Sequence, residues 1–136
     1  MADLAVEELT HYREVLKLLA ARGIPPGPDS KDPYVRGLNA LIRRGPEHFL
    51  LDRLLVAAIV EKRGSERFGL IASAHEDPAV QRFYRAISTS EDRHWQLFLD
   101  LAEEHCTDPD APGRLAELVA AEADLMTAQP LRAALH

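Results

Sequence analysis

The sequence predicts an all-α protein built as an antiparallel helical bundle, and three observations support this fold class. Apolar residues recur at intervals of three and four positions along four long stretches, which is the period of an amphipathic helix. Proline and glycine are concentrated in the connections, where they start and stop helices. One connection, residues 75–77, is so short that the helices on either side of it should be antiparallel neighbours.

The composition is that of one ordinary globular domain, which we expect to span residues 1–136. Of the 136 residues, 46% are apolar and 28% are charged, which is enough for one core but hardly for two. Cys106 is the only cysteine, so no internal disulfide can form, and the N-terminus lacks the features of a signal peptide. We therefore expect a cytoplasmic protein. No apolar run approaches the ~20 residues of a membrane span, so no membrane partner is expected.

The first long helix is expected over residues 3–22, which are good helix formers followed by Gly23. Its apolar face is interrupted by Glu8 and His11. Residues 23–47 are rich in proline and glycine and should form a crossover connection that contains one short helix.

The third helix should begin at Pro46 and run to about residue 74, with an apolar face that starts at Leu50 and includes Glu61. Gly64 lies within this helix, where glycine costs up to ~1 kcal/mol relative to alanine. We interpret Gly64 as leaving open space beside Glu61, and close packing of helices is the simpler alternative.

The fourth helix should follow a cap at Asp77 and extend to about residue 105. Its apolar face contains Glu91 and His94. Glu61 and Glu91 are equally distant from the middle of the turn, so their carboxylates should meet at one level of the bundle. Glu66 fails this test and is expected at the surface or behind the ligands.

The last helix is expected over residues 111–128 and carries Glu122 among apolar residues. A single glutamate in such a place is more often at the edge of the apolar face than a ligand.

Two Glu-x-x-His pairs thus lie on helix faces that should be buried. Residues three apart share one face of a helix, and such pairs hold metal ions in carboxylate-rich helical bundles. A buried carboxylate without a partner costs roughly several kcal/mol, and a metal ion would use both members of each pair. The oxygen-rich donor set suits iron or manganese better than structural zinc. The candidate metal ligands are Glu8, His11, Glu61, Glu91 and His94.

Residues next to the ligands could support them. Metal-bound histidines commonly donate their second ring N–H to an acceptor. Glu7 and Ser90 each precede a candidate ligand glutamate and are the nearest candidates for this role.

Three segments also resemble one family, the diiron tRNA hydroxylases that act on 2-methylthio-isopentenyl-adenosine next to the anticodon. These segments are EELTHYREVLKLLAARGIP (7–25), DRLLVAAIVEKRGSERF (52–68) and RFYRAISTSEDRHWQLFLDLA (82–102). The resemblance covers most of the chain, and the combination of IVEKRGSERF with SEDRHW is far more specific than Glu-x-x-His alone.

The resemblance implies a ferritin-like bundle with a diiron centre of two iron ions, molecular oxygen as co-substrate and an electron donor. The implied reaction is hydroxylation of the isopentenyl group on tRNA, with the same five ligands and no catalytic residues beyond them. Family members have a further helix that supplies another glutamate before the position of Glu8, and only seven residues precede Glu8 here. We therefore expect that the first helix of the family is absent. Glu122 or a residue of a second subunit could replace the missing ligand, and an exposed helix face could make the chain a homo-oligomer.

A tRNA partner requires a local basic face, because the formal net charge is −6. The candidates lie on two neighbouring helices, and simple solvation of the surface is the alternative. They are Lys62, Arg63, Arg67, Arg82, Arg85 and Arg93.

Two other functions stay open. One is a non-catalytic helical bundle that binds one metal or none and serves as an interaction module. The other is a ferritin-like oxidase that acts on a small molecule.

Overall fold

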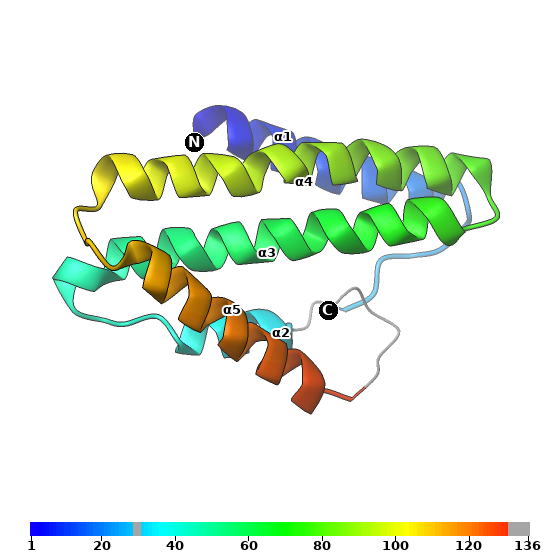
Figure 1. Ribbon diagram of the computed structural model, residues 1–136. Coiled ribbons are helices and arrows are strands. Elements are labelled where there is room, and N and C mark those ends of the chain that lie inside the picture. Colours follow the sequence, from blue (N-terminus) through cyan, green and yellow to red (C-terminus); the bar gives the residue numbers. More distant parts are fainter. Residues whose placement is uncertain (29–30, 131–136) are drawn as a thin grey trace. The chain divides into compact units, whose positions relative to one another are not determined.

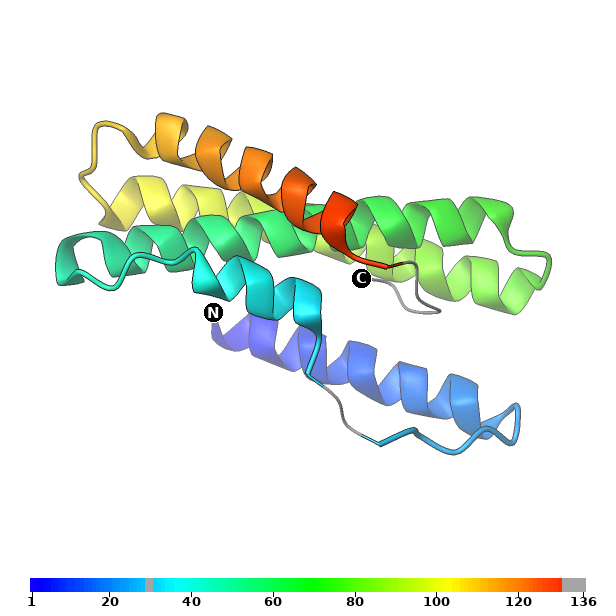
Figure 2. The same ribbon diagram turned by 90° about the horizontal axis from the view of Figure 1, so that it is seen from below.

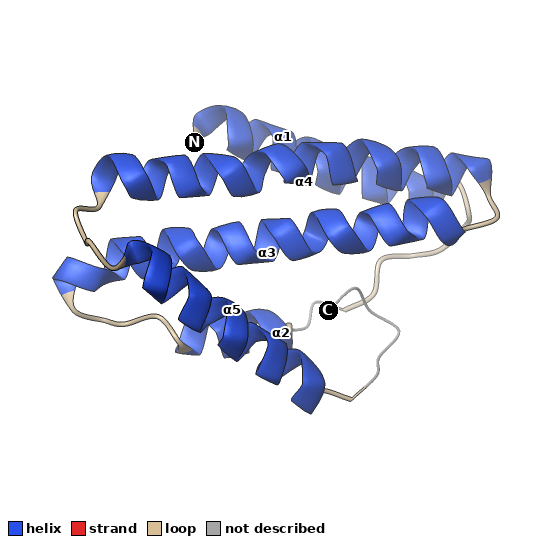
Figure 3. Cartoon of the chain, in the orientation of Figure 1, coloured by secondary structure: helices blue, strands red, loops and turns tan. Residues whose placement is uncertain are grey.

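The computed structural model describes residues 1–28 and 31–130, and within them every regular element is a helix (Figures 1 and 3). The helices are α1 (Ala2–Ala20), α2 (Pro33–Ala40), α3 (Pro46–Ala74), α4 (Pro78–His105) and α5 (Ala111–Ala128). The chain divides into two compact units, residues 1–31 and 32–136, and each is described separately. No helix of the described residues is long and apolar enough to cross a membrane.

The first unit consists of α1 and the start of the connection after it. Gly23 adopts a φ of +67°, in the left-handed region that glycine enters without steric cost. The N–H groups of Gly23 and Ile24 donate to the carbonyl groups of Ala20 and Leu19, each at 3.0 Å. This is the Schellman arrangement, so Gly23 ends the helix as the sequence predicts.

The second unit is organised around α3 and α4, a long antiparallel pair joined by the short turn at residues 75–77 (Figures 1 and 2). Asp77 caps α4 by accepting a hydrogen bond from the backbone N–H of Ala79 at 2.8 Å. Asp32 caps α2 in the same way, accepting from the N–H of Tyr34 at 2.7 Å. α5 contacts α2 and α3 and closes one side of this unit.

The core of the second unit lies where α2 and α5 pack on the first half of α3. Leu50 is half exposed, so the expectation that it starts the buried face of α3 is wrong. The core residues are Tyr34, Leu38, Ile42, Leu51, Leu55, Val56, Ile59, Ala102 and Leu118.

Candidate metal centre

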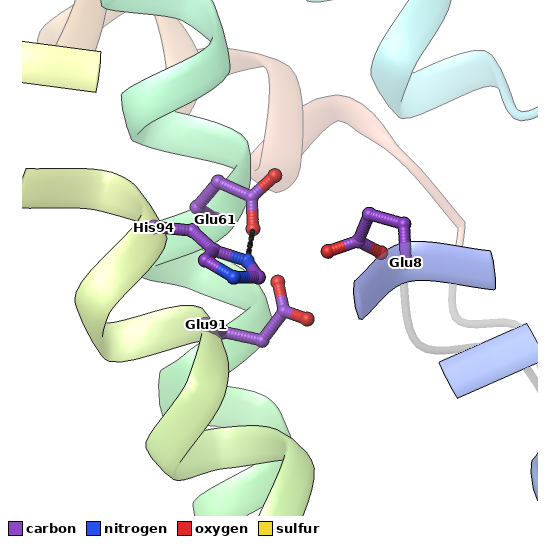
Figure 4. Close-up of side chains that lie close together, drawn as sticks. All are labelled: Glu8, Glu61, Glu91 and His94. Carbon is purple, nitrogen blue, oxygen red and sulfur yellow. Dashed lines mark ion pairs between the residues drawn. The ribbon is translucent and has the colours of Figure 1, made fainter. Parts of the chain in front are cut away.

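Glu61 on α3 and the pair Glu91 and His94 on α4 come together in the middle of the long helix pair (Figure 4). One carboxylate oxygen of each glutamate and one ring nitrogen of the histidine lie within 4.8 Å of one another. The Nδ1 atom of His94 is 3.5 Å from the Oε2 atom of Glu61. The expectation that Glu61 and Glu91 meet at one level of the bundle is confirmed.

These three side chains are largely withdrawn from water. Glu91 is 7% exposed, His94 is 4% exposed, and the side chain of Glu61 is 16% exposed. Two carboxylates held this close in a weakly solvated place repel each other, and a divalent cation between them would remove that repulsion. A donor set of two carboxylates and one imidazole therefore fits a metal such as iron or manganese.

Small residues let α3 and α4 approach each other closely beside the cluster. The hydroxyl group of Ser65 donates to the backbone carbonyl of Ser88 at 3.1 Å, and the hydroxyl group of Ser88 donates back to the carbonyl of Ser65 at 2.8 Å. A Cβ atom at Gly64 would lie 3.7 Å from Oε2 of Glu91. That distance is ordinary van der Waals contact, so Gly64 lies next to the carboxylate of Glu91.

The other Glu-x-x-His pair lies on α1, in the first unit. Oε2 of Glu8 and Nδ1 of His11 are 3.7 Å apart, so this pair shares one helix face as its spacing predicts. Glu7, one of the two expected supporting residues, is half-buried on the same helix. The other, Ser90, is 4% exposed on α4 and accepts a hydrogen bond from Nη2 of Arg93 at 3.4 Å.

Glu122 is not part of the cluster around Glu61. It is buried, with 2% exposure, and accepts a hydrogen bond from the hydroxyl group of Tyr34 and one from Nε of Arg63, both at 3.1 Å. These bonds join α2, α3 and α5. The carboxylate of Glu122 therefore has a structural use in this protein, and we leave it out of the ligand set.

The basic residues expected to face tRNA fall into two groups. On α3, Lys62 pairs with Asp92 at 3.0 Å, and Arg63 pairs with the exposed Glu66 at 2.8 Å. Arg67 is only 18% exposed, with its guanidinium group 4.8 Å from the ring centre of Tyr34. These three side chains are therefore engaged within the second unit. The three on α4 are exposed, namely Arg82, Arg85 and Arg93.

Comparison with known proteins gives the same family as the sequence motifs. A family model described as tRNA-(MS[2]IO[6]A)-hydroxylase (MiaE) matches residues 1–136. A protein of Pseudomonas putida named tRNA 2-(methylsulfanyl)-N(6)-isopentenyladenosine(37) hydroxylase is 41% identical over 127 residues, which cover 93% of this chain and 61% of that protein. A protein of Salmonella typhimurium with the same name is 33% identical over 126 residues, which cover 93% of this chain and 46% of that protein.

A solved structure is also similar over nearly the whole chain. It is described as protein 43 with aldehyde deformylating oxygenase activity from Synechococcus, and it matches with a TM-score of 0.89 and 33% sequence identity over 98% of this chain and 66% of its own. The fold is thus the expected ferritin-like one. The chain spans about three-fifths of the Pseudomonas relative and about half of the Salmonella relative. With the family model matched from end to end and both relatives carrying the same name, this chain belongs to the MiaE family of tRNA hydroxylases.

Proposed function

We propose that this chain forms the metal-binding bundle of an oxygen-dependent diiron monooxygenase that hydroxylates the isopentenyl group of a modified adenosine in tRNA. The observation that carries the proposal is the buried cluster of Glu61, Glu91 and His94, found on the segments that resemble the family. The names of the two relatives support the substrate and the reaction. We also propose that the protein works in the cytoplasm.

The proposed ligands come from both units of the chain. Glu61, Glu91 and His94 would hold metal from the second unit, and Glu8 and His11 would add a carboxylate and an imidazole from the first. Iron bound there would supply the activation of molecular oxygen that hydroxylation requires.

The protein around the cluster would shield the reacting group from water. Ile87 and Phe98 are buried on the same face of α4 as the ligands, one turn to either side of them. Hydroxylation places one oxygen atom in a C–H bond and reduces the other to water, which consumes two electrons and two protons. An electron donor is therefore part of the proposal.

Replacing Glu91 tests this function, because a metal ligand supports the chemistry and not the docking of tRNA. With ferrous iron, a reductant and tRNA that carries the isopentenyl group, we expect wild type to hydroxylate the tRNA and Glu91→Ala to lose that activity. The affinity for tRNA should change little in Glu91→Ala. The exposed Glu66 on the neighbouring helix provides the matched control, and Glu66→Ala should retain activity. Wild type that binds iron but leaves tRNA unmodified would refute the proposal.

A second candidate is an oxygenase that acts on a small molecule. The Synechococcus structure favours it, since that protein is described by an activity on aldehydes. Supplying the iron-loaded protein with an aldehyde in place of tRNA separates the two candidates, because only the second predicts turnover.

A further inference from the structure

A small pocket lies in the second unit where α2 ends and α3 begins. Its volume is about 180 Å³. We refer to it as the arginine pocket, and it is lined by Asn39, Ile42, Arg44, Phe49 and Arg53.

Two exposed guanidinium groups, those of Arg44 and Arg53, give this pocket a positive charge that no carboxylate of the described residues neutralises. Nη1 of Arg53 donates to Oδ1 of Asn39 at 3.2 Å, which orients this guanidinium group beside the pocket. Among the described residues, neither Arg44 nor Arg53 forms an ion pair with a carboxylate. Both are therefore available to a ligand with negative charge.

The carboxylates nearest in sequence do not cancel this charge. Asp52 is fully buried and is held by Arg43 and Arg114 at 2.8 and 2.9 Å. The exposed Glu47 lies 3.6 Å from the ring of His48, and its carboxylate is folded back toward Gly45 at the start of its own helix. The pocket thus remains basic in a chain whose formal net charge is −6.

An aromatic ring adds a second kind of contact. Phe49 is 47% exposed in the first turn of α3, where the helix N-terminus contributes further positive potential. Guanidinium groups that bind phosphate, together with an exposed ring on which a base can stack, are the usual features of a surface for single-stranded RNA. An apolar partner alone would not require the two arginines.

The pocket lies within reach of the metal cluster along one helix. Arg53 and Glu61 are both on α3, separated by about 12 Å along the axis and about 80° around it. A strand of RNA held at the arginine pocket could span that distance with a few nucleotides.

We propose that the arginine pocket binds the RNA strand that flanks the modified adenosine, with Arg44 and Arg53 on phosphate groups and Phe49 stacked on a base. This rests on the proposed function, in which the substrate is tRNA. It adds an anchoring site to the exposed arginines of α4 and does not involve the metal ligands.

The test measures binding of an anticodon stem-loop RNA over a series of salt concentrations. Each phosphate contact that is removed should lower the slope of log affinity against log salt by about 0.7 to 0.9, as expected for Arg44→Ala and for Arg53→Ala. Phe49→Ala should weaken binding about tenfold with little change in slope, because stacking releases no counterions. The matched control is Arg13→Ala, which removes an exposed arginine of α1 that lies 3.4 Å from Glu14.

The outcomes separate this inference from the function on which it rests. If wild type binds the RNA and all three pocket variants keep its slope and affinity, the arginine pocket is not the anchoring site and the hydroxylase proposal stands. If wild type with iron bound fails to bind the RNA at any salt concentration, both proposals fall. Among the described residues, the exposed side chain of Arg44 forms no hydrogen bond or ion pair, so a loss of binding in Arg44→Ala with unchanged helicity would not be explained by unfolding.

Discussion

Asp52 is a fully buried carboxylate whose charge is balanced by hydrogen bonds from neighbouring groups. Its carboxylate accepts hydrogen bonds from the backbone N–H of Arg43 at 2.8 Å, from Nη2 of Arg43 at 2.8 Å and from Nη2 of Arg114 at 2.9 Å. Arg114 also donates to the carbonyl of Leu41 at 2.8 Å. One carboxylate therefore ties the segment after α2 to α3 and α5.

The ionisation of Asp52 should make stability depend on pH. Burial alone would raise the pKa of this carboxyl group, but the hydrogen bonds from Arg43 and Arg114 outweigh burial and hold the pKa of Asp52 well below its usual range. A pKa that is lower in the folded state stabilises the fold above the unfolded pKa of about 4, and that stabilisation is lost as the pH falls toward the folded pKa.

Asp52→Asn should lower the free energy of unfolding by about 3 to 5 kcal/mol at pH 7, because two guanidinium groups lose their charged partner. The difference from wild type should narrow below about pH 4. Chemical denaturation at several pH values measures both effects. The exposed Asp124 on α5 provides the control, and the account of Asp52 is wrong if Asp124→Asn is as destabilising.

Sequence patterns reveal some of these residues and not others. Glu61, Glu91 and His94 could be grouped in advance, because the turn at 75–77 fixes the level at which two antiparallel helices meet. Nothing comparable fixes the rotation of α5, so the burial of Glu122 against Tyr34 could not be predicted. Asp52 is followed in the sequence by the exposed Arg53, so the sequence does not indicate whether Asp52 is buried or at the surface.

At the scale of elements, the helix boundaries follow from a few residues with strong local preferences. Pro33, Pro46 and Pro78 each occupy the first turn of a helix, and Gly23 ends α1. The rotation of α3 is not set locally, because apolar residues occur on more than one of its faces. Packing of α2 and α5 buries Leu51 and leaves Leu50 half exposed. Which of these two leucines is buried is therefore determined by tertiary contacts and not by the sequence of α3.

The contact between α3 and α4 includes the reciprocal hydrogen bonds of Ser65 and Ser88. Ser65→Ala and Ser88→Ala should each reduce the free energy of unfolding by about 1 kcal/mol. If the pair also keeps the metal ligands at the right spacing, both variants should bind ferrous iron more weakly than wild type.

Ser73 on α3 offers a matched control for these two serines. Among the described residues, its hydroxyl group donates to one acceptor, the carbonyl of Gly69 in its own helix, at 2.9 Å. Ser73→Ala should therefore leave iron binding unchanged. If iron titrations give the same affinity for wild type and all three variants, Ser65 and Ser88 do not set the spacing of the metal ligands.

At the scale of the whole molecule, the candidate metal ligands are distributed over the two units of a ferritin-like chain of the MiaE family. The second unit holds Glu61, Glu91 and His94 in a buried cluster, and the first unit carries Glu8 and His11 on one face of α1. The diiron centre that we propose would use ligands from each of these units. The proposed chemistry is therefore a property of the whole chain and of the longer proteins that it resembles.

The measurement that tests the metal centre most directly is the iron content per chain after anaerobic loading with ferrous iron and removal of unbound metal. Wild type should retain two iron ions, and Glu61→Ala and His94→Ala should retain markedly less while keeping their helicity. Glu66→Ala, which changes an exposed glutamate on the same helix as Glu61, should retain as much iron as wild type. Equal iron in all four proteins, or none in wild type, would contradict the assignment of Glu61 and His94 as metal ligands.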